Sequence, residues 1–534
     1  MSRTGAAAPG LVVWLVALVA TLPLLVAVLS FFSAQEGVWP HLARYVLPEA
    51  LANTIWLVAG VALCTSILGV SLAWLVASCE FRGRRFFNWA LLLPMAMPGY
   101  VLGFAFAALF ELTGPVQGAW RDLFGVSAWF PDVGPRGASV ITLSFVLYPY
   151  VYLIVREAFA SQGIRGMEVA RGFGYSPLQA FFKVSLPMAR PWLVAGVSLA
   201  VMECLADFGT VKLFNYTTFT TAIYRAWYGL FSLQSALQLS LVLVGLVLAA
   251  LLLERRLRGR SRYTPPGNAR QRRIALTPGK AATATLYCTA ILVIAFGLPV
   301  SLIVVWSLRN FAGEFDAGYW QLAVNTLMLS SGAALMITAV AILLSVTVRR
   351  VPTAMNRSLS RVATLGYAIP GTVLAVGFFV PVAWFSRMLN QYIGSTTGTV
   401  VALQSGLAVI FLAYLARYLA VAHSPVESAL QRIRPDVEEA ARGMGVSGLE
   451  LLGRVHLPIL RPAIFTAVLL VFVDIMKELP ITLMTRPFGW DTLAVKVFQL
   501  TTEGEWHRAA LPALAIVVVG LLPVMLLNRQ RRRC

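Results

Sequence analysis

The chain has 534 residues, of which 58% are hydrophobic and only 12% are charged, and its mean hydropathy is +0.76. Soluble proteins have about a quarter of their residues charged, so this composition excludes a soluble globular domain and a disordered or coiled-coil chain. The five cysteines stand singly, without a CxxC pair, which argues against a metal–thiolate or redox site.

Apolar runs recur along the whole chain, and they predict an all-α polytopic membrane protein with twelve spanning helices. Each run is close to the roughly 20 residues that a spanning helix needs. The first run follows a short n-region, but it is longer than the apolar core of a signal peptide and no clean cleavage site follows, so we interpret it as a span. The predicted spans are residues 11–32, 54–78, 86–110, 138–157, 192–210, 235–253, 286–306, 325–348, 362–386, 399–421, 463–484 and 510–528.

Basic residues orient these spans. If the N-terminus is cytoplasmic, 32 of the 43 Lys and Arg residues belong to the cytoplasmic side, counting Arg156 and Arg417 near the ends of their spans with the loops that follow, and ten to predicted periplasmic segments, with Lys477 inside a span. Cytoplasmic loops of membrane proteins carry such an excess of Lys and Arg. We therefore expect both termini to be cytoplasmic. The net charge of +20 is then mainly an orientation signal, and the expected surroundings are membrane lipid and no nucleic acid.

An internal repeat runs through the chain at an offset of 271 to 272 residues. Asn53 opens a predicted helix as Asn325 opens its counterpart, and PGYVL at Pro98–Leu102 matches PGTVL at Pro370–Leu374. Six-helix halves enter the membrane in the same direction, so we expect a parallel, pseudo-two-fold repeat with a pathway at its seam. The predicted divisions are a first half at 1–253, a basic cytoplasmic linker at 254–285 and a second half at 286–534.

The halves match best in a predicted cytoplasmic loop after the fourth span. The first copy is EVARGFGYSPLQAFFKVSLPMARP at Glu168–Pro191 and the second is EAARGMGVSGLELLGRVHLPILRP at Glu439–Pro462, and they align without a gap. In each copy the acid suits the positive end of a short helix, a glycine six residues later permits a turn, and Leu-Pro starts the next segment. The alternative for a single copy is an ordinary basic loop with a capped surface helix.

These loops resemble the "EAA" loop of ABC-transporter permeases, with one departure at Val169, where alanine is usual. The resemblance implies two tandem type I ABC permease domains, whose loops at 162–191 and 428–462 dock into two copies of a cytoplasmic ATPase. It assigns ATPase coupling to Glu168, Ala170, Gly174, Leu186, Pro187, Glu439, Ala440, Ala441, Gly445, Leu457 and Pro458.

The chain itself has no GxxxxGK[ST] phosphate loop, and no predicted cytoplasmic segment is long enough for a nucleotide-binding domain. We therefore expect a transport subunit and not an enzyme. No cofactor is expected on this chain, since ATP and Mg²⁺ would bind to the partner ATPase.

Charged side chains inside predicted spans are costly, so each is a candidate functional residue. Glu203 and Asp207 lie four residues apart and are expected to share a helix face. The repeat maps this pair onto Asp474 and Glu478. Because hard oxygen donors suit a highly charged cation, these four acids form our candidate substrate pathway, with transient binding of Fe³⁺. The alternative is a structural role at helix ends, loop amides or Lys477, which we expect to pair with Asp474 or Glu478.

The substrate prediction comes from a second resemblance. The segment ADFGTVKLFNYTTFTTAIYRAWYG at Ala206–Gly229 resembles the ferric-iron uptake permeases, which work with a periplasmic iron-binding protein. It implies a bacterial inner-membrane permease for ferric iron. Importers of thiamine or 2-aminoethylphosphonate share the double-permease layout and stay as alternatives. A proton-coupled secondary transporter, with the four acids as its relay, is an alternative of another class that leaves the paired loops unexplained.

The longest predicted periplasmic segments, 111–137 and 486–509, each carry two tryptophans beside mixed charges. Such surfaces suit the two lobes of a binding protein. Tryptophans at the membrane–water interface explain the same residues equally well, so no contact residue is assigned.

Overall fold

The structure of the chain is a computed structural model that describes residues 4–32, 38–112, 114–125, 129–131, 133–162, 170, 172–258, 273–397 and 406–531. Apart from two short strands, the regular structure of these residues is helical. Twelve of the described helices are long and apolar enough to cross a membrane, which confirms the predicted all-α polytopic fold.

Two compact units make up the structure, and they interleave in the sequence. Unit 1 comprises Met1–Leu42, Ile223–Val244 and Phe315–Lys496. Unit 2 comprises Ala43–Ala222, Gly245–Glu314 and Val497–Cys534. Three described α-helices cross a unit boundary, namely α12 (Phe219–Tyr224), α13 (Leu233–Arg258) and α24 (Leu493–Thr502), and so does the π-helical turn Leu42–Val46.

In unit 1 the N-terminal helix packs among helices from the far end of the sequence, against α16, α17 and α18. The approach is close, since a Cβ atom on Gly377 would lie 2.5 Å from Cβ of Pro23. The remaining helices of unit 1 are α1 (Thr4–Phe31), α2 (Trp39–His41), α16 (Ala317–Arg350), α17 (Ala354–Ala363), α18 (Gly371–Thr397), α19 (Leu407–Gln431), α20 (Pro435–Gly443), α21 (Gly448–Leu451), α22 (Leu457–Met476) and α23 (Pro480–Thr485).

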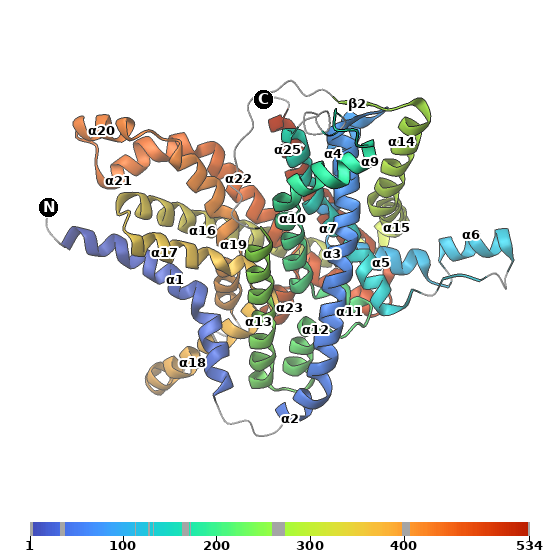
Figure 1. Cartoon of the computed structure of the whole chain (residues 1–534). Coiled ribbons are helices and arrows are strands. Elements are labelled where there is room, and N and C mark those ends of the chain that lie inside the picture. The colour runs from blue at the N-terminus through green and yellow to red at the C-terminus, as the bar shows by residue number, and fades with distance from the viewer. Residues whose placement is uncertain are drawn as a thin grey trace. The chain divides into compact units, whose positions relative to one another are not determined.

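In unit 2 three long helices, α3, α7 and α10, pack side by side (Figure 1). The helices α14, α15 and α25, which lie after residue 277 in the sequence, belong to the same unit. The elements of unit 2 are α3 (Leu47–Ser78), β1 (Cys79–Glu80), α4 (Arg84–Ala90), α5 (Gly99–Phe110), α6 (Pro115–Phe124), α7 (Gly134–Gln162), α9 (Pro177–Ala180), α10 (Leu186–Ala206), α11 (Gly209–Leu213), β2 (Ile274–Ala275), α14 (Pro278–Leu292), α15 (Leu298–Glu314) and α25 (Trp506–Arg531).

The compact units therefore differ from the sequence halves, because the terminal helices pack with helices of the other half. The division of the sequence into two repeated halves, joined by a linker at 254–285, remains a prediction. The repeat itself recurs in the contacts: Asn53 Nδ2 donates to the carbonyl oxygen of Thr217 at 2.9 Å. In the same way, Asn325 Nδ2 donates to the carbonyl oxygen of Gly489 at 3.1 Å, 272 residues further along at both ends.

Two predicted spans break at the candidate acids, where single helices were expected. Helix α10 ends at Ala206, and Asp207 has extended backbone angles (φ −66°, ψ 133°). Helix α22 ends at Met476, and α23 starts only at Pro480, which has no N–H to continue a helix. The expectation that the two acids of each pair share one helix is therefore wrong.

Short π-helical and 3₁₀ turns lie next to several of the α-helices. π-Helical turns precede α10 and α22 at equivalent positions of the repeat, and each supplies one extra residue per turn before a Leu-Pro start. The π-helical turns are Leu42–Val46, Phe181–Ser185, Arg225–Gly229, Val293–Gly297 and Leu452–His456, and the 3₁₀ turns are Leu93–Ala96 and Thr364–Ala368.

Candidate functional site

The second loop contains a short helix, as the sequence predicts, but this helix starts earlier. Helix α20 begins at Pro435, at the first helical position where proline is well tolerated, and not at Glu439. It ends at Gly443, and Gly445 adopts the left-handed conformation (φ +85°) that turns the chain away. The next long helix, α22, starts at Leu457 as predicted.

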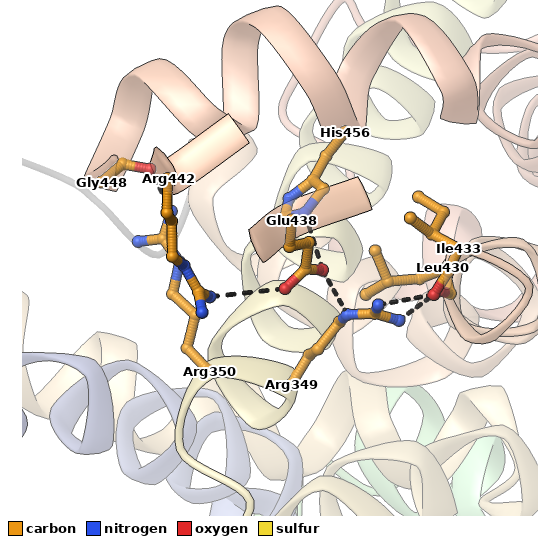
Figure 2. A network of polar contacts seen from close by, with 8 residues as sticks. All are labelled: Arg349, Arg350, Leu430, Ile433, Glu438, Arg442, Gly448 and His456. Carbon is orange, nitrogen blue, oxygen red and sulfur yellow. Dashed lines mark hydrogen bonds and ion pairs between the residues drawn. The ribbon is translucent and has the colours of Figure 1, made fainter. Parts of the chain in front are cut away.

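A buried carboxylate, Glu438, holds this short helix in place (Figure 2). Its Oε1 atom lies 2.6 Å from Nε of Arg349 and 3.0 Å from Nε2 of His456, and its Oε2 atom lies 3.4 Å from Nη2 of Arg442. The side chain of Glu438 is 11% exposed and that of His456 is 2% exposed. Charge-assisted hydrogen bonds of this kind are the strong ones, so the network fixes α20 to two other parts of the unit.

Arg349 extends the network to a third helix. Its guanidinium also donates to the carbonyl oxygen of Leu430, in the last turn of α19, and, at 2.7 Å, to that of Ile433, two residues after the helix ends. Its neighbour Arg350 donates to the carbonyl oxygen of Gly448 at the start of α21 (Figure 2). The two arginines at the end of α16 thus bind the start and the middle of the loop, and Arg349 satisfies carbonyl groups that the C-terminal end of α19 leaves unpaired.

The resemblance pointed to Glu439, but the structure makes its neighbour the anchor. Glu439 and Ala440 are exposed, whereas Glu438 and Ala441 are buried on the inner face of α20. The missed signal is the spacing of Glu438 and Ala441, three residues apart and thus on one helix face. Sequence alone could not supply the partner, because Arg349 is 89 residues away from Glu438.

The described part of the first loop has the same turn but a different anchor. Glu168 lies outside the described residues. Ala170 is buried, Gly174 is left-handed (φ +82°), and Leu186-Pro187 starts α10 as predicted. The turn glycine and the Leu-Pro start therefore recur in both loops.

The anchor of the first loop is apolar. Ala170 and Ala180 form a small buried cluster, against which Trp74, Val184 and Ile274 pack. At the offset of 271 residues, Glu438 corresponds to Met167 and His456 to Ser185, so these two members of the network have no counterparts in the first loop, whereas Arg442 corresponds to Arg171. Among the described residues of the first loop, burial of apolar surface holds the loop in place.

Two of the four candidate acids bind helix starts. Asp207 accepts hydrogen bonds from the backbone N–H groups of Thr210 (3.1 Å) and Val211 (3.2 Å) at α11. Glu478 accepts them from Ile481 (2.9 Å) and Thr482 (3.1 Å) at α23. These bonds satisfy N–H groups that the interrupted helices would otherwise leave unpaired. Both contacts favour the structural role that the sequence analysis left open for these acids.

The repeated Pro-Gly motif has a physical reason here. A Cβ atom on Gly99 would lie 2.5 Å from Oγ1 of Thr210 and 3.2 Å from Oδ2 of Asp207. A Cβ atom on Gly371 would lie 3.0 Å from Oε1 of Glu478. Each glycine therefore leaves room for a carboxylate that packs directly on the start of α5 or α18.

The other two acids are partly exposed. Asp474 Oδ1 lies 3.0 Å from Nζ of Lys477, and both side chains are 27% exposed, which confirms that Lys477 pairs with one of the acids. Glu203 is also partly exposed on α10. In the described part of the chain, no group of three or more His, Cys, Asp and Glu side chains is placed to hold a metal ion.

The ion pair of Asp474 and Lys477 is expected to contribute little to stability. Replacing Lys477 by Gln should lower the free energy of unfolding by less than about 1 kcal/mol, because both partners are partly exposed. A double-mutant cycle with Asp474→Asn, followed by thermal unfolding in detergent, measures the pair. A coupling energy well above this range would contradict the expectation.

The comparisons with known proteins identify the family. The family model for the binding-protein-dependent transport system inner membrane component matches residues 66–262 and 337–532, which is most of the chain. The chain belongs to this family. It is therefore the permease of an ABC importer, a multi-pass protein of the inner membrane and a non-catalytic subunit. The two matches also agree with the internal repeat.

Several curated proteins are similar to this permease. The "Fe(3+)-transport system permease protein FbpB 2" of Haemophilus influenzae is 26% identical over 496 residues, which cover 91% of each chain. The "Putative 2-aminoethylphosphonate transport system permease protein PhnV" of Salmonella typhimurium is 26% identical over 271 residues, 48% of this chain and 97% of its own. The "Sulfate transport system permease protein CysT" of Escherichia coli is 31% identical over 27% of this chain and 50% of its own.

One solved structure, of a bacterial alginate ABC transporter in complex with a periplasmic protein bound to an alginate pentasaccharide, covers 47% of this chain and 94% of its own. Its sequence identity is 16% and its TM-score is 0.36. This likeness is too low to support a conclusion about the permease. The family match alone already excludes the proton-coupled secondary transporter among the alternatives.

Proposed function

We propose that this permease imports ferric iron from the periplasm into the cytoplasm. The observation that carries the proposal is the similarity to the ferric-transport permease of Haemophilus influenzae, which extends over 91% of both chains. The similarity to the 2-aminoethylphosphonate permease covers 48% of this chain. The ferric-transport permease therefore aligns with both halves of the sequence, whereas the 2-aminoethylphosphonate permease aligns with about half of it.

In this proposal two copies of a cytoplasmic ABC ATPase bind under the loops at 162–191 and 428–462 and hold ATP and Mg²⁺. A periplasmic iron-binding protein delivers the ion, and both termini are cytoplasmic. The exposure of Glu439 and Ala440 on a helix that Glu438 anchors supports docking at the second loop. A rigidly held helix can carry the motion of a docked subunit into α16, α19 and α22.

The candidate pathway consists of four acids, Glu203, Asp207, Asp474 and Glu478. We propose that two of them position helices and that the other two contact the ion. The hydrogen bonds of Asp207 and Glu478 to helix starts support a positioning task for these two acids. Glu203 and Asp474, which are partly exposed, are then the proposed transient contacts for Fe³⁺.

The test is ATP-dependent uptake of radiolabelled ferric iron into proteoliposomes that contain the permease with its ATPase and binding protein. We expect Glu203→Gln/Asp474→Asn to lower uptake at least about tenfold, the loss of roughly 1.4 kcal/mol of transition-state stabilisation, while ATP turnover persists. Glu168→Ala/Glu439→Ala should lower both uptake and the ATP turnover that the loaded binding protein stimulates.

Two results would contradict the proposal. Unchanged iron uptake in the Glu203→Gln/Asp474→Asn variant would leave these acids with a structural role. Uptake of thiamine or 2-aminoethylphosphonate, with no iron uptake by the unaltered protein, would overturn the substrate but not the ABC importer.

A further inference from the structure

The first coupling loop depends on a segment far away in the sequence. Ile274, from the basic linker between the halves, packs against the buried cluster of Ala170 and Ala180 together with Trp74 and Val184. Ile274 is itself half-buried, although the residues before it, Arg270–Arg273, are polar and basic. An apolar side chain in such a linker is expected to have a packing role.

Backbone pairing fixes the position of Ile274. Strand β2 pairs in parallel with β1, with Cys79 opposite Ile274 and Glu80 opposite Ala275. Backbone hydrogen bonds between such strands hold the register of their side chains. Cys79 is buried, and burial raises the pKa of its thiol to about 11, so the thiol stays protonated at neutral pH.

Side-chain contacts on both sides of β2 reinforce this pairing. Before the strand, Nη1 of Arg273 lies 3.7 Å from Oε2 of Glu80. After it, Oγ1 of Thr285 donates to the carbonyl oxygen of Arg82 at 3.0 Å. The chain from Arg273 to Thr285 is thus bound to β1, which directly follows α3, and to the turn after β1.

An aromatic cluster connects this attachment to the loop. The ring of Trp74, on α3, lies 4.8 Å from the ring of Phe181 and 5.1 Å from that of Phe159, measured between centroids. Phe181 starts the π-helical turn that leads into α10. Displacement of Ile274 would therefore loosen the packing of Trp74 against the part of the loop that continues into the membrane.

We propose that the linker segment Arg273–Ala275 braces the first coupling loop, so that the linker positions one of the two ATPase contacts in addition to connecting the halves. This proposal rests on the proposed function of the loops. It gives the first loop an apolar brace where the second loop has an ion network. The second loop has Arg349, Glu438 and His456 for the same purpose.

The test compares two aspartates at neighbouring positions of the full-length permease. Ile274→Asp introduces a charge on the packed side of β2, whereas Ala275→Asp introduces the same charge on the exposed side. Ile274→Ala and Ile274→Val are milder variants that retain an uncharged side chain. Hydrogen–deuterium exchange of the permease alone reports local opening without any need for transport.

We expect Ile274→Asp to raise amide exchange in residues 172–185 at least about tenfold, with a smaller rise for Ile274→Ala and none for Ile274→Val or Ala275→Asp. Exchange in residues 435–456 should stay unchanged in all four variants. In the complex with the ATPase and the loaded binding protein, Ile274→Asp should lower the stimulated ATP turnover about twofold, because only one of two loops loses its position.

Unchanged amide exchange in residues 172–185 of the Ile274→Asp variant would overturn the brace, independently of any effect on ATP turnover. A rise with unchanged ATP turnover, in an assay where Glu439→Ala does lower turnover, would overturn the role of the linker in coupling. If Glu439→Ala also leaves turnover unchanged, the proposed coupling role of the loops fails, whereas amide exchange in residues 172–185 still decides the brace.

Discussion

Replacing Glu438 by Ala is expected to destabilise the second coupling loop strongly. The variant leaves Arg349 and His456 without the carboxylate that both contact, at 2.6 Å and 3.0 Å. Removing one partner of a buried ion pair costs roughly 3–5 kcal/mol, and we expect about 2–4 kcal/mol here because water can partly solvate Arg349. The side chain of Arg349 is 22% exposed.

Thermal unfolding of the detergent-solubilised permease measures this loss, and amide exchange in residues 435–456 locates it. The matched control is Glu439→Ala, which removes the same charge one residue along, where the side chain is exposed. We expect the control to keep the unfolding temperature and the exchange of the unaltered protein while it lowers coupled ATP turnover. Equal loss of stability in both variants would contradict the assignment of Glu438 as the anchor.

Replacing Gly99 or Gly371 by Ala is the second change with a large expected effect. The added methyl group at Gly99 would lie 2.5 Å from Oγ1 of the buried Thr210, closer than carbon and oxygen atoms can approach. At Gly371 the nearest atoms are Oε1 of Glu478 at 3.0 Å and Cγ of Pro480 at 3.1 Å. Overpacking of this kind costs about 1–3 kcal/mol, and we expect the larger cost at Gly99.

A suitable control is Gly245→Ala in α13, where an added Cβ atom meets nothing within 4 Å. This variant should be neutral or up to about 1 kcal/mol more stable, because alanine favours a helix over glycine. Thermal unfolding of the three variants in one detergent gives the ranking. A Gly99→Ala variant as stable as Gly245→Ala would show that the carboxylate and Thr210 can move aside at little cost.

Much of the architecture is readable from the sequence by itself. Twelve spans follow from apolar runs, because the cost of placing polar groups in lipid acts residue by residue along the chain. The repeat follows from residue identity at a constant offset, and the family follows from the two loop motifs. The turn glycines Gly174 and Gly445 are also local, because a left-handed turn favours a residue without a side chain.

Only the tertiary structure decided which groups meet. Glu438 becomes the anchor because the fold places Arg349 beside it, and the same fold leaves Glu439 exposed. The breaks at Asp207 and Glu478 depend on hydrogen bonds to the helices that follow, and the role of Ile274 depends on the pairing of β2 with β1. Local patterns set how a segment folds, whereas contacts between distant segments depend on geometry that no single segment contains.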